Sequence, residues 1–407
     1  MNATDVPAVE GQIGVLKTSC VYRGDFDPQE NKAVLPEEYE RTSCPVTANT
    51  LIVSRMNTPD LVGAAGVVRQ NHGNLYLPDR LWQVHFHDAN PAYAHYWSRT
   101  LSYRAQVEAA CAGTSSSMQN LGQDAFRSFV FPCPPVPEQN AIATFLDREI
   151  AKIDALVVEQ QKLIALLKEK RQAIISHAVT KGLDPTVPMK ESGVEWLGLV
   201  PAHWDFFPMK RDLIFLTSGS RGWADHYSEE GALFIRIGNL TRDDITLDLS
   251  DIQRVVVPPG SEGERTGVRP GDVLFSITAY LGSVAVVPAN LGLAYVSQHV
   301  ALARLNKKKL LPEWLAYVAK SIVGKTYLEM QGYGGTKVQL SLDDVANLPV
   351  TVPPIREQEA IVQFVRTETA KLEAMTEQAQ QATALLQERR TAVISAAVTG
   401  KIKVTAD

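Results

Sequence analysis

The chain has 407 residues, enough for two or three ordinary domains, and its 45% hydrophobic and 21% charged residues are typical of a globular protein. A net charge of −5 excludes a chain that is basic throughout but allows a local basic face, and no apolar run approaches the roughly 20 residues of a membrane helix. The N-terminus lacks the regions of a signal peptide and the four cysteines form no CxxC pair, so we expect a cytoplasmic protein without a zinc site or a disulfide framework.

The first globular part is predicted at residues 1–131. It carries short β-type runs, such as GVLKTSCVY and NTLIVSRM, which are separated by Gly, Pro and Asp turns. A short helix is expected at Pro91–Leu101, with Asn90 as its N-cap and Pro91 at its first position. These features predict an α+β domain with a mainly antiparallel sheet.

A long helix is predicted to begin near Glu138 and to run for about 40 residues, or roughly 60 Å. The stretch Lys181–Ser192 is typical of a linker, and new β-type runs follow (ALFIRIGNL, GDVLFSITAY and LAYVSQHVALARL), with a short helix at Pro312–Val323. A second long helix begins near Glu357. We therefore predict two α+β domains that alternate with two helical spacers, at residues 1–131, 132–182, 183–350 and 351–407.

The two spacers are copies of one sequence. The segment that begins at Pro134 matches the segment that begins at Pro353 without a gap, so that one constant offset relates all paired positions. About half of these positions are identical, including Glu138/Glu357, Gln139/Gln358, Phe145/Phe364, Arg171/Arg390 and Ser176/Ser395. Weaker matches continue upstream, so the chain is predicted to repeat one unit, a globular part and its helix, with pseudo-two-fold symmetry.

Each spacer has a heptad seam, which predicts a narrow stripe that is buried against another helix. The predicted seam positions are Ile153, Leu156, Gln160, Leu163, Leu167, Lys170 and Ile174 in the first helix, and Leu372, Met375, Ala379, Ala382, Leu386, Arg389 and Val393 in the second. Because the first helix leads from one domain to the other, the second buries its seam most simply by running back antiparallel. We therefore expect the C-terminus to return to the first domain.

The first globular part is predicted to be short at its N-terminal side. If Gly14–Val21 is paired with Phe234–Thr241, the first residue of the chain falls opposite about Arg221. The segment Glu191–Ser220, which leads into the second globular part, then has no counterpart in the first.

Several motifs resemble those of the DNA-specificity subunit of type I restriction–modification enzymes. These are ESGVEWLGLVPAHW (Glu191–Trp204), PPVPEQ and PPIREQ before the two helices, and the segment Gly14–Pro36. The resemblance covers nearly the whole chain and implies that each globular part is a target-recognition domain that reads one half of an asymmetric, bipartite DNA site. It also implies that the helices space the domains and dock two methyltransferase subunits, which restriction subunits then join.

Motifs of catalytic chemistry are not found. Asn90-Pro-Ala-Tyr93 is similar to an amino-methyltransferase motif, but its equivalent in the repeat, Leu311-Pro-Glu-Trp314, lacks the Asn. The glycine-rich stretches match neither GxGxxG nor the Walker loop, and the close pair His85 and His87 has no cysteine or carboxylate cluster in register. We expect no catalytic residue, metal or cofactor in this chain; the resemblance implies that S-adenosylmethionine, ATP and Mg belong to the partner subunits.

DNA readout requires polar side chains on exposed loops. The candidates in the first copy are Arg55, Asn57, Thr58, Ser115, Ser116, Ser117 and Gln119, and those in the second are Ser276, Thr278, Tyr280, Gln298, Thr336, Lys337 and Gln339. All of them except Gln298, which is a separate candidate, lie in loops at matching positions of the repeat, and this match favours a role in DNA contact for the set.

Four alternatives stay open at this level. The chain could be a single-chain modification or cleavage enzyme, against which the missing cofactor motifs count. It could be a structural coiled-coil protein, which would leave two folded domains without a role. It could also be an orphan DNA-binding or scaffold protein of another defence or modification system, or a truncated, inactive specificity subunit.

Overall fold

The computed structural model describes residues 3–111, 117–194, 197–219, 222–257, 265–332 and 339–404. The chain divides into two compact units, each of which holds one globular domain and parts of both long helices. Unit 1 comprises Met1–Lys162 and Ala379–Asp407, and unit 2 comprises Leu163–Gln378. The long helices are α4 (Val136–Lys181) and α8 (Ile355–Val398).

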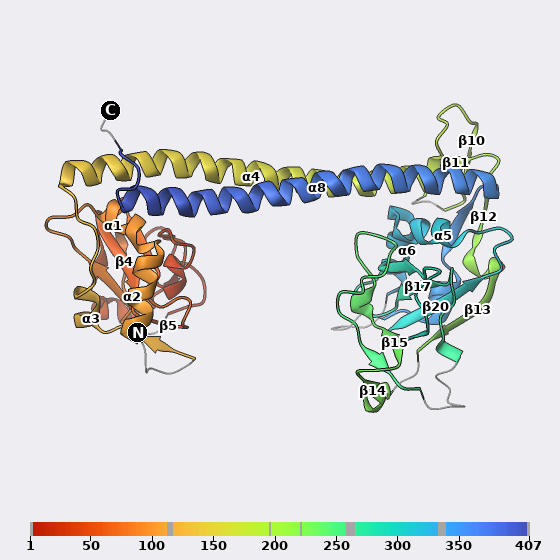
Figure 1. Cartoon of the computed structure of the whole chain (residues 1–407), viewed down its shortest axis with the longest axis horizontal. Helices are drawn as coiled ribbons and strands as arrows, with labels where there is room; N and C mark the ends of the chain where they lie inside the picture. Colours follow the sequence, from red (N-terminus) through yellow and green to blue (C-terminus); the bar gives the residue numbers. More distant parts are fainter. Residues whose placement is uncertain are drawn as a thin grey trace. The chain divides into compact units, whose positions relative to one another are not determined.

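The domain of unit 1 contains a three-stranded sheet in the order β6-β4-β8, a four-stranded sheet in the order β2-β1-β7-β3 and the pair β5-β9. The strands are β1 (Gly14–Leu16), β2 (Asn31–Ala33), β3 (Pro45–Val46), β4 (Thr50–Ser54), β5 (Met56–Asn57), β6 (Ala65–Val68), β7 (His72–Tyr76), β8 (Leu81–Val84) and β9 (Gln119–Asn120). The helices are η1 (Thr18–Val21), η2 (Pro36–Arg41), α1 (Pro91–Ser98), α2 (Leu101–Cys111) and α3 (Gln123–Arg127). The helix α1 packs on β4 and β6 (Figure 1).

The domain of unit 2 has two four-stranded sheets, in the orders β13-β20-β17-β18 and β14-β16-β15-β19, and the pairs β12-β21 and β10-β11. The strands are β10 (Met189–Glu191), β11 (Leu199–Pro201), β12 (Asp205–Pro208), β13 (Leu213–Ser218), β14 (Tyr227–Ser228), β15 (Ala232–Ile235), β16 (Arg254–Val255), β17 (Val273–Ser276), β18 (Val284–Val286), β19 (Ala294–Val296), β20 (Val300–Leu305) and β21 (Pro349–Val352). The helices are η3 (Met209–Asp212), η4 (Trp223–His226), η5 (Ile237–Asn239), α5 (Pro312–Lys320), α6 (Ile322–Gln331) and α7 (Leu342–Ala346).

The repeat extends through the two domains. In each, a central strand (β4 or β17) lies between two antiparallel neighbours, and the other sheet of the domain contains a parallel pair (β1 with β7, or β15 with β19). The predicted α+β class with mainly antiparallel sheets is confirmed. The sheets differ in their edges: β13 covers the outer edge of β20, whereas β8 is the last described strand of its sheet, and β19 ends its sheet, whereas β7 is followed by β3.

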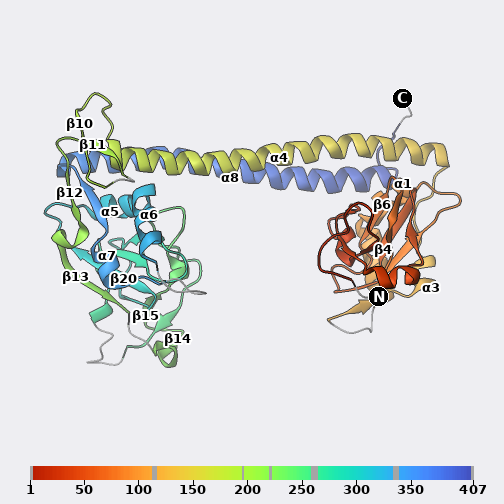
Figure 2. The ribbon, with the colours of Figure 1, turned by 180° about the vertical axis from the view of Figure 1, so that it is seen from behind.

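In both units the segments of α4 and α8 lie side by side and run antiparallel (Figures 1 and 2). In unit 1 the Nε of Arg390 is 2.8 Å from Asp154 Oδ1, and in unit 2 NH1 of Arg171 is 3.5 Å from Glu373 Oε2. Arg171 follows Asp154 in α4 by the same number of residues by which Glu373 precedes Arg390 in α8. This equal and opposite spacing is what antiparallel helices require. The two pairs are equivalent positions of the repeat, because Asp154 matches Glu373 and Arg171 matches Arg390.

The buried seam differs from the predicted one by one residue at alternate positions. Leu156, Leu163 and Met375 are exposed, so the seam predicted through them is wrong. The inward-facing positions are Ile153, Val157, Gln160, Ile164, Leu167, Arg171 and Ile174 in α4, and Leu372, Thr376, Ala379, Thr383, Leu386, Arg390 and Val393 in α8. Adjacent apolar residues fit either phase of a heptad; the observed phase turns the two arginines toward the other helix.

A buried glutamine joins each helix to its domain. The Oε1 of Gln358 accepts a hydrogen bond from the Leu311 N–H (2.9 Å), and its Nε2 donates to the carbonyl oxygens of Lys309 (2.6 Å) and Pro353 (2.8 Å). Gln139 has the same place in unit 1, where its Oε1 accepts from the Asn90 N–H (2.8 Å) and its Nε2 donates to the carbonyl oxygen of Pro134 (2.7 Å). Both side chains are fully buried. Each therefore fixes the beginning of a long helix against the beginning of a short one.

The far end of α8 returns to the first domain, as predicted. Ile394, Ala397 and Val398 belong to the apolar core of unit 1, and Val404 packs against that core. The hydroxyl of Tyr93 donates a hydrogen bond to the carbonyl oxygen of Val398 (3.1 Å). Among the described residues, no helix is both long enough and apolar enough to cross a membrane.

We predict that Gln358→Leu lowers the free energy of unfolding by about 3 kcal/mol, because three backbone groups lose the hydrogen bonds that they make with this buried side chain. Urea unfolding followed by circular dichroism measures the change. The matched control is Gln363→Leu, the same substitution on the exposed face of α8, for which we expect a change below about 0.5 kcal/mol. Equal midpoints for the two variants would contradict the anchoring role.

Candidate nucleic-acid interface

In each unit, the loop that follows the central strand pairs with a second segment that carries predicted DNA contacts. In unit 1, Asn57 pairs with Gln119 through β5 and β9. In unit 2, Thr278 pairs with Gln339 through an isolated bridge. The structure thus brings together, at equivalent places, residues that lie far apart in the sequence. We treat these paired loops as the candidate interface.

Asn57 supports its loop rather than projecting from it. The side chain is buried; its Nδ2 donates to the Tyr22 hydroxyl (2.8 Å) and to Ser54 Oγ (3.2 Å), and its Oδ1 accepts from the Thr58 N–H (2.9 Å). The prediction that Asn57 is an exposed DNA contact is therefore wrong, because its polar atoms are occupied within the loop. Thr58, the next residue, is exposed.

The remaining candidates of unit 1 surround this loop. Arg55 is half-buried, and its Nε donates to the carbonyl oxygen of Asp79 (2.5 Å). Ser117 is exposed and Gln119 is half-buried, whereas Ser115 and Ser116 lie outside the described residues. Arg104 stabilises the loop by donating hydrogen bonds to the carbonyl oxygens of Val62 (2.7 Å) and Pro59 (2.8 Å). A braced loop presents its exposed side chains at a fixed position.

Two candidates of unit 2 are buried. Ser276 is 1% exposed and its hydroxyl donates to the carbonyl oxygen of Thr278 (2.8 Å), and Thr278 is 5% exposed. The prediction that either is an exposed contact is wrong, since the chain turns outward only after them, at Ala279, which has a φ of 63°. Tyr280 is 52% exposed and Gln339 is also exposed. Thr336 and Lys337 lie outside the described residues.

Tyr280 lies under a basic side chain that the sequence analysis missed. The guanidinium carbon of Arg242 is 3.6 Å from the centre of the Tyr280 ring, a close cation–π contact. Both line a pocket of about 440 Å³ together with Gln172, Lys320, Lys325, Glu329 and residues 279–283. Arg242 precedes the strand β17 and is distant from Tyr280 in the sequence. Only the fold shows that this loop of unit 2 carries a local positive charge.

Lys320 holds the backbone next to Arg242. Its side chain is 6% exposed, and its Nζ donates to the carbonyl oxygen of Thr241 (3.1 Å). Burial lowers the pKa of Lys320 to about 8. The nearby carboxylates of Asp244 and Asp243 raise the pKa and so offset part of this effect. Lys320 therefore positions the loop that bears Arg242 and is too buried to contact DNA itself.

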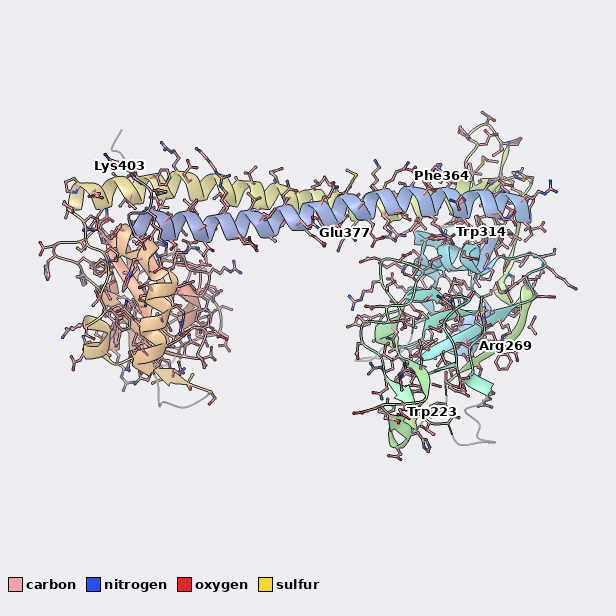
Figure 3. All side chains as sticks on the ribbon, in the orientation of Figure 1. Trp223, Arg269, Trp314, Phe364, Glu377 and Lys403 are labelled. Atoms are coloured by element: carbon pink, nitrogen blue, oxygen red, sulfur yellow. The ribbon has the colours of Figure 1, made fainter. Side chains whose placement is uncertain are left out.

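The last candidate, Gln298, lies in a different pocket of unit 2. Gln298 is half-buried and its Nε2 is 3.0 Å from His299 Nε2. The pocket has a volume of about 470 Å³ and contains Trp223, whose ring stacks on Phe234 with centres 5.2 Å apart. Figure 3 shows Trp223 at the end of unit 2 opposite α8. Gln298 therefore does not join the loop of Tyr280 in one pocket.

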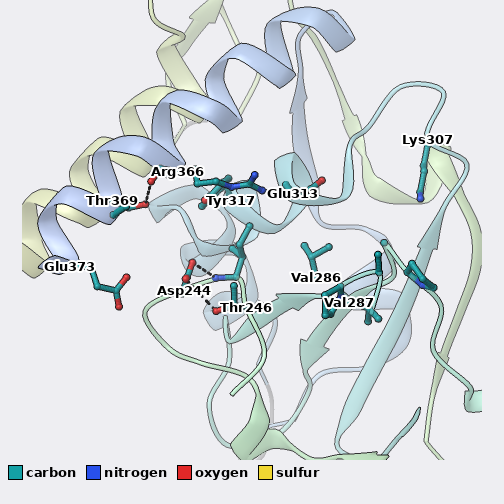
Figure 4. Close-up of a pocket in the computed structure, with 16 residues that line it drawn as sticks. Asp244, Thr246, Val286, Val287, Lys307, Glu313, Tyr317, Arg366, Thr369 and Glu373 are labelled. Atoms are coloured by element: carbon teal, nitrogen blue, oxygen red, sulfur yellow. Dashed lines mark hydrogen bonds and ion pairs between the residues drawn. The ribbon is translucent and has the colours of Figure 1, made fainter. Parts of the chain in front are cut away.

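A charged pocket of about 520 Å³ lies where α8 meets the domain of unit 2 (Figure 4). Arg171 links its acidic side chains, with NH2 3.4 Å from Asp244 Oδ1 and NH1 3.5 Å from Glu373 Oε2. Within the described part of the chain, no group of three or more His, Cys, Asp or Glu side chains is placed to hold a metal ion. These charges join the helix pair to the domain.

Comparisons with known proteins agree with the sequence motifs. Residues 265–384 match the family model described as "Type I restriction modification DNA specificity domain". The EcoKI specificity subunit of Escherichia coli K12 is 27% identical over 321 residues, which cover 76% of this chain and 65% of that protein. The EcoBI specificity subunit of Escherichia coli is 24% identical over 307 residues, covering 73% and 63%. The chain thus spans just under two thirds of the length of these relatives.

Two solved structures share the fold. One, from a study of complex assembly and conformational transition of the type I R-M system, has a TM-score of 0.71 at 17% identity, over 97% of this chain and 93% of that one. The other is the HsdS subunit of Thermoanaerobacter tengcongensis, with a TM-score of 0.56 at 16% identity, over 97% and 92%. At such identities the likeness shows the fold.

We predict that Lys320→Met raises the free energy of unfolding at pH 7 by about 2 kcal/mol. The lowered pKa means that folding disfavours the charged form of Lys320 by about 3 kcal/mol, and the substitution removes this cost. It also removes the hydrogen bond to Thr241, which reduces the gain in stability by about 1 kcal/mol. The pKa lies below its ordinary value of 10.5, so the unfolded chain binds more protons and wild-type stability rises between about pH 8 and pH 10.5.

Urea unfolding at pH 7 and pH 10 measures this difference. The advantage of Lys320→Met shrinks at pH 10, where the wild-type amine is largely neutral in the folded chain. Lys325→Met, at an exposed lysine of the same pocket, is the control and leaves the pH dependence unchanged. An advantage that is as large at pH 10 as at pH 7 would refute the buried charge.

Proposed function

We propose that the chain is the non-catalytic DNA-reading subunit of a type I restriction–modification enzyme, which the family match over residues 265–384 and the likeness to the two Escherichia coli specificity subunits support. Each globular domain reads one half of an asymmetric, bipartite site in double-stranded DNA. The observation that carries the proposal is the duplicated interface: the same two loops pair in both domains and present different side chains. A repeated scaffold with divergent loops is what two readers of different half-sites require.

The partners follow from the same proposal. The subunit assembles with two methyltransferase subunits and with restriction subunits, which bind S-adenosylmethionine, ATP and Mg. The paired helices α4 and α8 supply their docking surface and the spacing between the domains. The compartment is the cytoplasm, where the DNA is. The acidic total charge supports this division of labour, because the partners then provide part of the phosphate contacts.

Copurification with the methyltransferase subunits, followed by mapping of methylated bases in host DNA, tests the function. The complex methylates one bipartite sequence, and the isolated chain neither methylates nor cuts DNA in the presence of S-adenosylmethionine, ATP and Mg. Turnover by the highly purified chain would refute a non-catalytic role. A complex that methylates no sequence would refute the proposed reader.

We predict that exchanging Gly14–Phe131 for the equivalent region of a relative changes one half of the methylated sequence and leaves the other half unchanged. The reason is that this region lies wholly in one domain, so the paired loops of unit 2 keep their sequence and their support. Methylation mapping of the exchanged complex gives the result. A change in both halves would contradict two independent readers.

We predict that Arg242→Ala weakens DNA binding by the complex about tenfold, as expected for the loss of one charged contact. If the guanidinium contacts a phosphate, the slope of log Kd against log salt falls by about 0.9 and the loss is similar on all sequences. The control is Arg211→Ala, because Arg211 also lies over an aromatic ring, 5.7 Å from the centre of Phe207, but outside the loop. Equal losses for the two variants would exclude the Tyr280 loop from the interface.

A further inference from the structure

The pocket that contains Gln298 lies where two parallel strands of unit 2 end. Because β15 and β19 pair in parallel, the segments that follow them leave the sheet at the same edge. Arg236–Gly238 follows β15 and Ser297–His299 follows β19, and both segments line the pocket together with Trp223 and Tyr227. Three parts of the chain therefore converge on a space of about 470 Å³, which is in the range of sites for small ligands.

Three aromatic rings line this pocket. Trp223 and Phe234 stack with an angle of 9° between their planes, and both side chains are buried. The Tyr227 ring lies beside this stack, with its centre 5.7 Å from that of Phe234, but Tyr227 is 46% exposed. A buried stack thus supports one ring whose surface is accessible to a planar ligand.

Ser297 contributes a hydroxyl that is buried without a partner. Its N–H donates to the carbonyl oxygen of Ile235 (2.8 Å), and its carbonyl oxygen accepts from the Val300 N–H (3.0 Å), so its backbone groups are satisfied. Its Oγ makes no hydrogen bond to any residue that the structure describes. Buried hydroxyls nearly always have a partner, because an unpaired one is costly. A ligand with a donor or an acceptor at this point supplies that partner.

The arginine of the pocket is neutralised by a carboxylate of the same pocket. The NH2 group of Arg236 is 2.9 Å from Asp251 Oδ2. Gln298 is half-buried and uncharged, and its amide has both a donor and an acceptor. The lining therefore favours a planar, polar and uncharged group over a phosphate.

The pocket is anchored to the candidate DNA interface through the backbone. The Ile277 N–H donates to the carbonyl oxygen of His299 (3.1 Å). Ile277 directly precedes Thr278 in the loop that carries Tyr280. The turn that supplies the serine and the glutamine to the pocket is thus held by the same loop that we assign to the interface.

Unit 1 has different chemistry at the equivalent turn. There the Arg55 N–H donates to the carbonyl oxygen of Arg80 in the same way (3.0 Å), so Pro78-Asp79-Arg80 occupies the place of Ser297–His299. Proline has neither a hydroxyl nor an N–H. The buried hydroxyl of unit 2 is therefore not a requirement of the shared scaffold, which favours a role in binding a ligand of this one domain.

We propose that this pocket, the base pocket, binds one unpaired nucleobase. The base lies on the Tyr227 ring, and its polar edge contacts the Ser297 hydroxyl and the Gln298 amide. A nucleobase is planar and uncharged and carries donors and acceptors on its edge, and pockets that take up an extruded base hold it by stacking and by such edge contacts. The inference rests on the proposed function, because the bond to Ile277 favours DNA at the interface as the source of the base. A free nucleotide offers the same chemistry.

The test compares fluorescein-labelled DNA duplexes that differ at one position, with the full chain as the binding protein. One duplex is fully paired, one carries a single unpaired nucleotide with each of the four bases in turn, and one carries an unpaired abasic nucleotide. By anisotropy, we expect at least one unpaired base to bind at least tenfold more tightly than the abasic site, which bends the backbone similarly but has no base. Equal affinities for all five unpaired sites would overturn DNA as the source.

Titration with the four free deoxynucleoside monophosphates distinguishes the two sources of a base. If the base comes from DNA, the monophosphate of the preferred base removes the advantage of the unpaired site and leaves binding of the paired duplex unchanged. Saturable binding of a monophosphate without any preference among the duplexes assigns the pocket to a free nucleotide. Absence of both would overturn the base pocket. A chain that binds no paired duplex contradicts the proposed function instead, while the monophosphates still report on the pocket.

Substitutions locate the site. Ser297→Ala removes a hydroxyl that has no partner in the described structure, so we expect an unchanged or higher Tm and a preference for the base that is at least fivefold smaller. Gln298→Ala lowers the preference at least as much. The matched control is Gln253→Ala, because Gln253 lies in the same domain outside the pocket and donates to the carbonyl oxygen of Arg254 (3.0 Å). Equal preferences in all three variants would overturn the assignment to this pocket.

Discussion

Gln139 and Gln358 lie where each globular domain meets the helix that follows it, and the course of the chain depends on them. Each side chain satisfies backbone groups of two segments at once, the start of a short helix and the turn before a long one. An unsatisfied backbone group in such a place is costly, so the amide allows few other geometries. The direction of a long helix is thereby set from inside its domain.

The same logic continues at the other end of each helix. Ile175, Ala178 and Val179 of α4 enter the core of unit 2, and their equivalents Ile394, Ala397 and Val398 of α8 enter the core of unit 1. Each domain therefore holds the beginning of one helix and the end of the other. The loops after β4 and β17 differ, although this support is the same in both domains. Arg104 donates a hydrogen bond to the carbonyl oxygen of Val62 at the first loop, and Arg242 lies over the Tyr280 ring at the second.

Much of this architecture could be predicted because the repeat is an observation within one sequence. The gap-free offset identified both helices, their equivalence and the identical pair Gln139 and Gln358, but not that these two side chains are buried. The phase of the seam could not be predicted, since Leu156 and Val157 are both apolar and only the partner helix decides between them. Site residues were predicted least well. A loop sequence does not show that Ser276 points inward, or that Arg242 comes to lie on Tyr280.

Strand order could not be predicted from the sequence, because it depends on contacts between distant residues. The sequence does not show that β4 and β17 are the central strands of their sheets, or that Trp82 in unit 1 occupies the position that Ala301 has in unit 2.

The paired contacts of Asp154 with Arg390 and of Arg171 with Glu373 have a consequence for how such a molecule can be encoded. Because the two pairs are equivalent positions, α4 alone carries both an acidic and a basic member at the right separation. One helix sequence is thus complementary to a second copy of itself in the antiparallel orientation, as in an isologous interface. One copy of the repeat therefore carries both members of the ion pair that joins the two long helices. Duplication within a single gene then lets the two halves diverge in what their loops present while the shared interface stays the same.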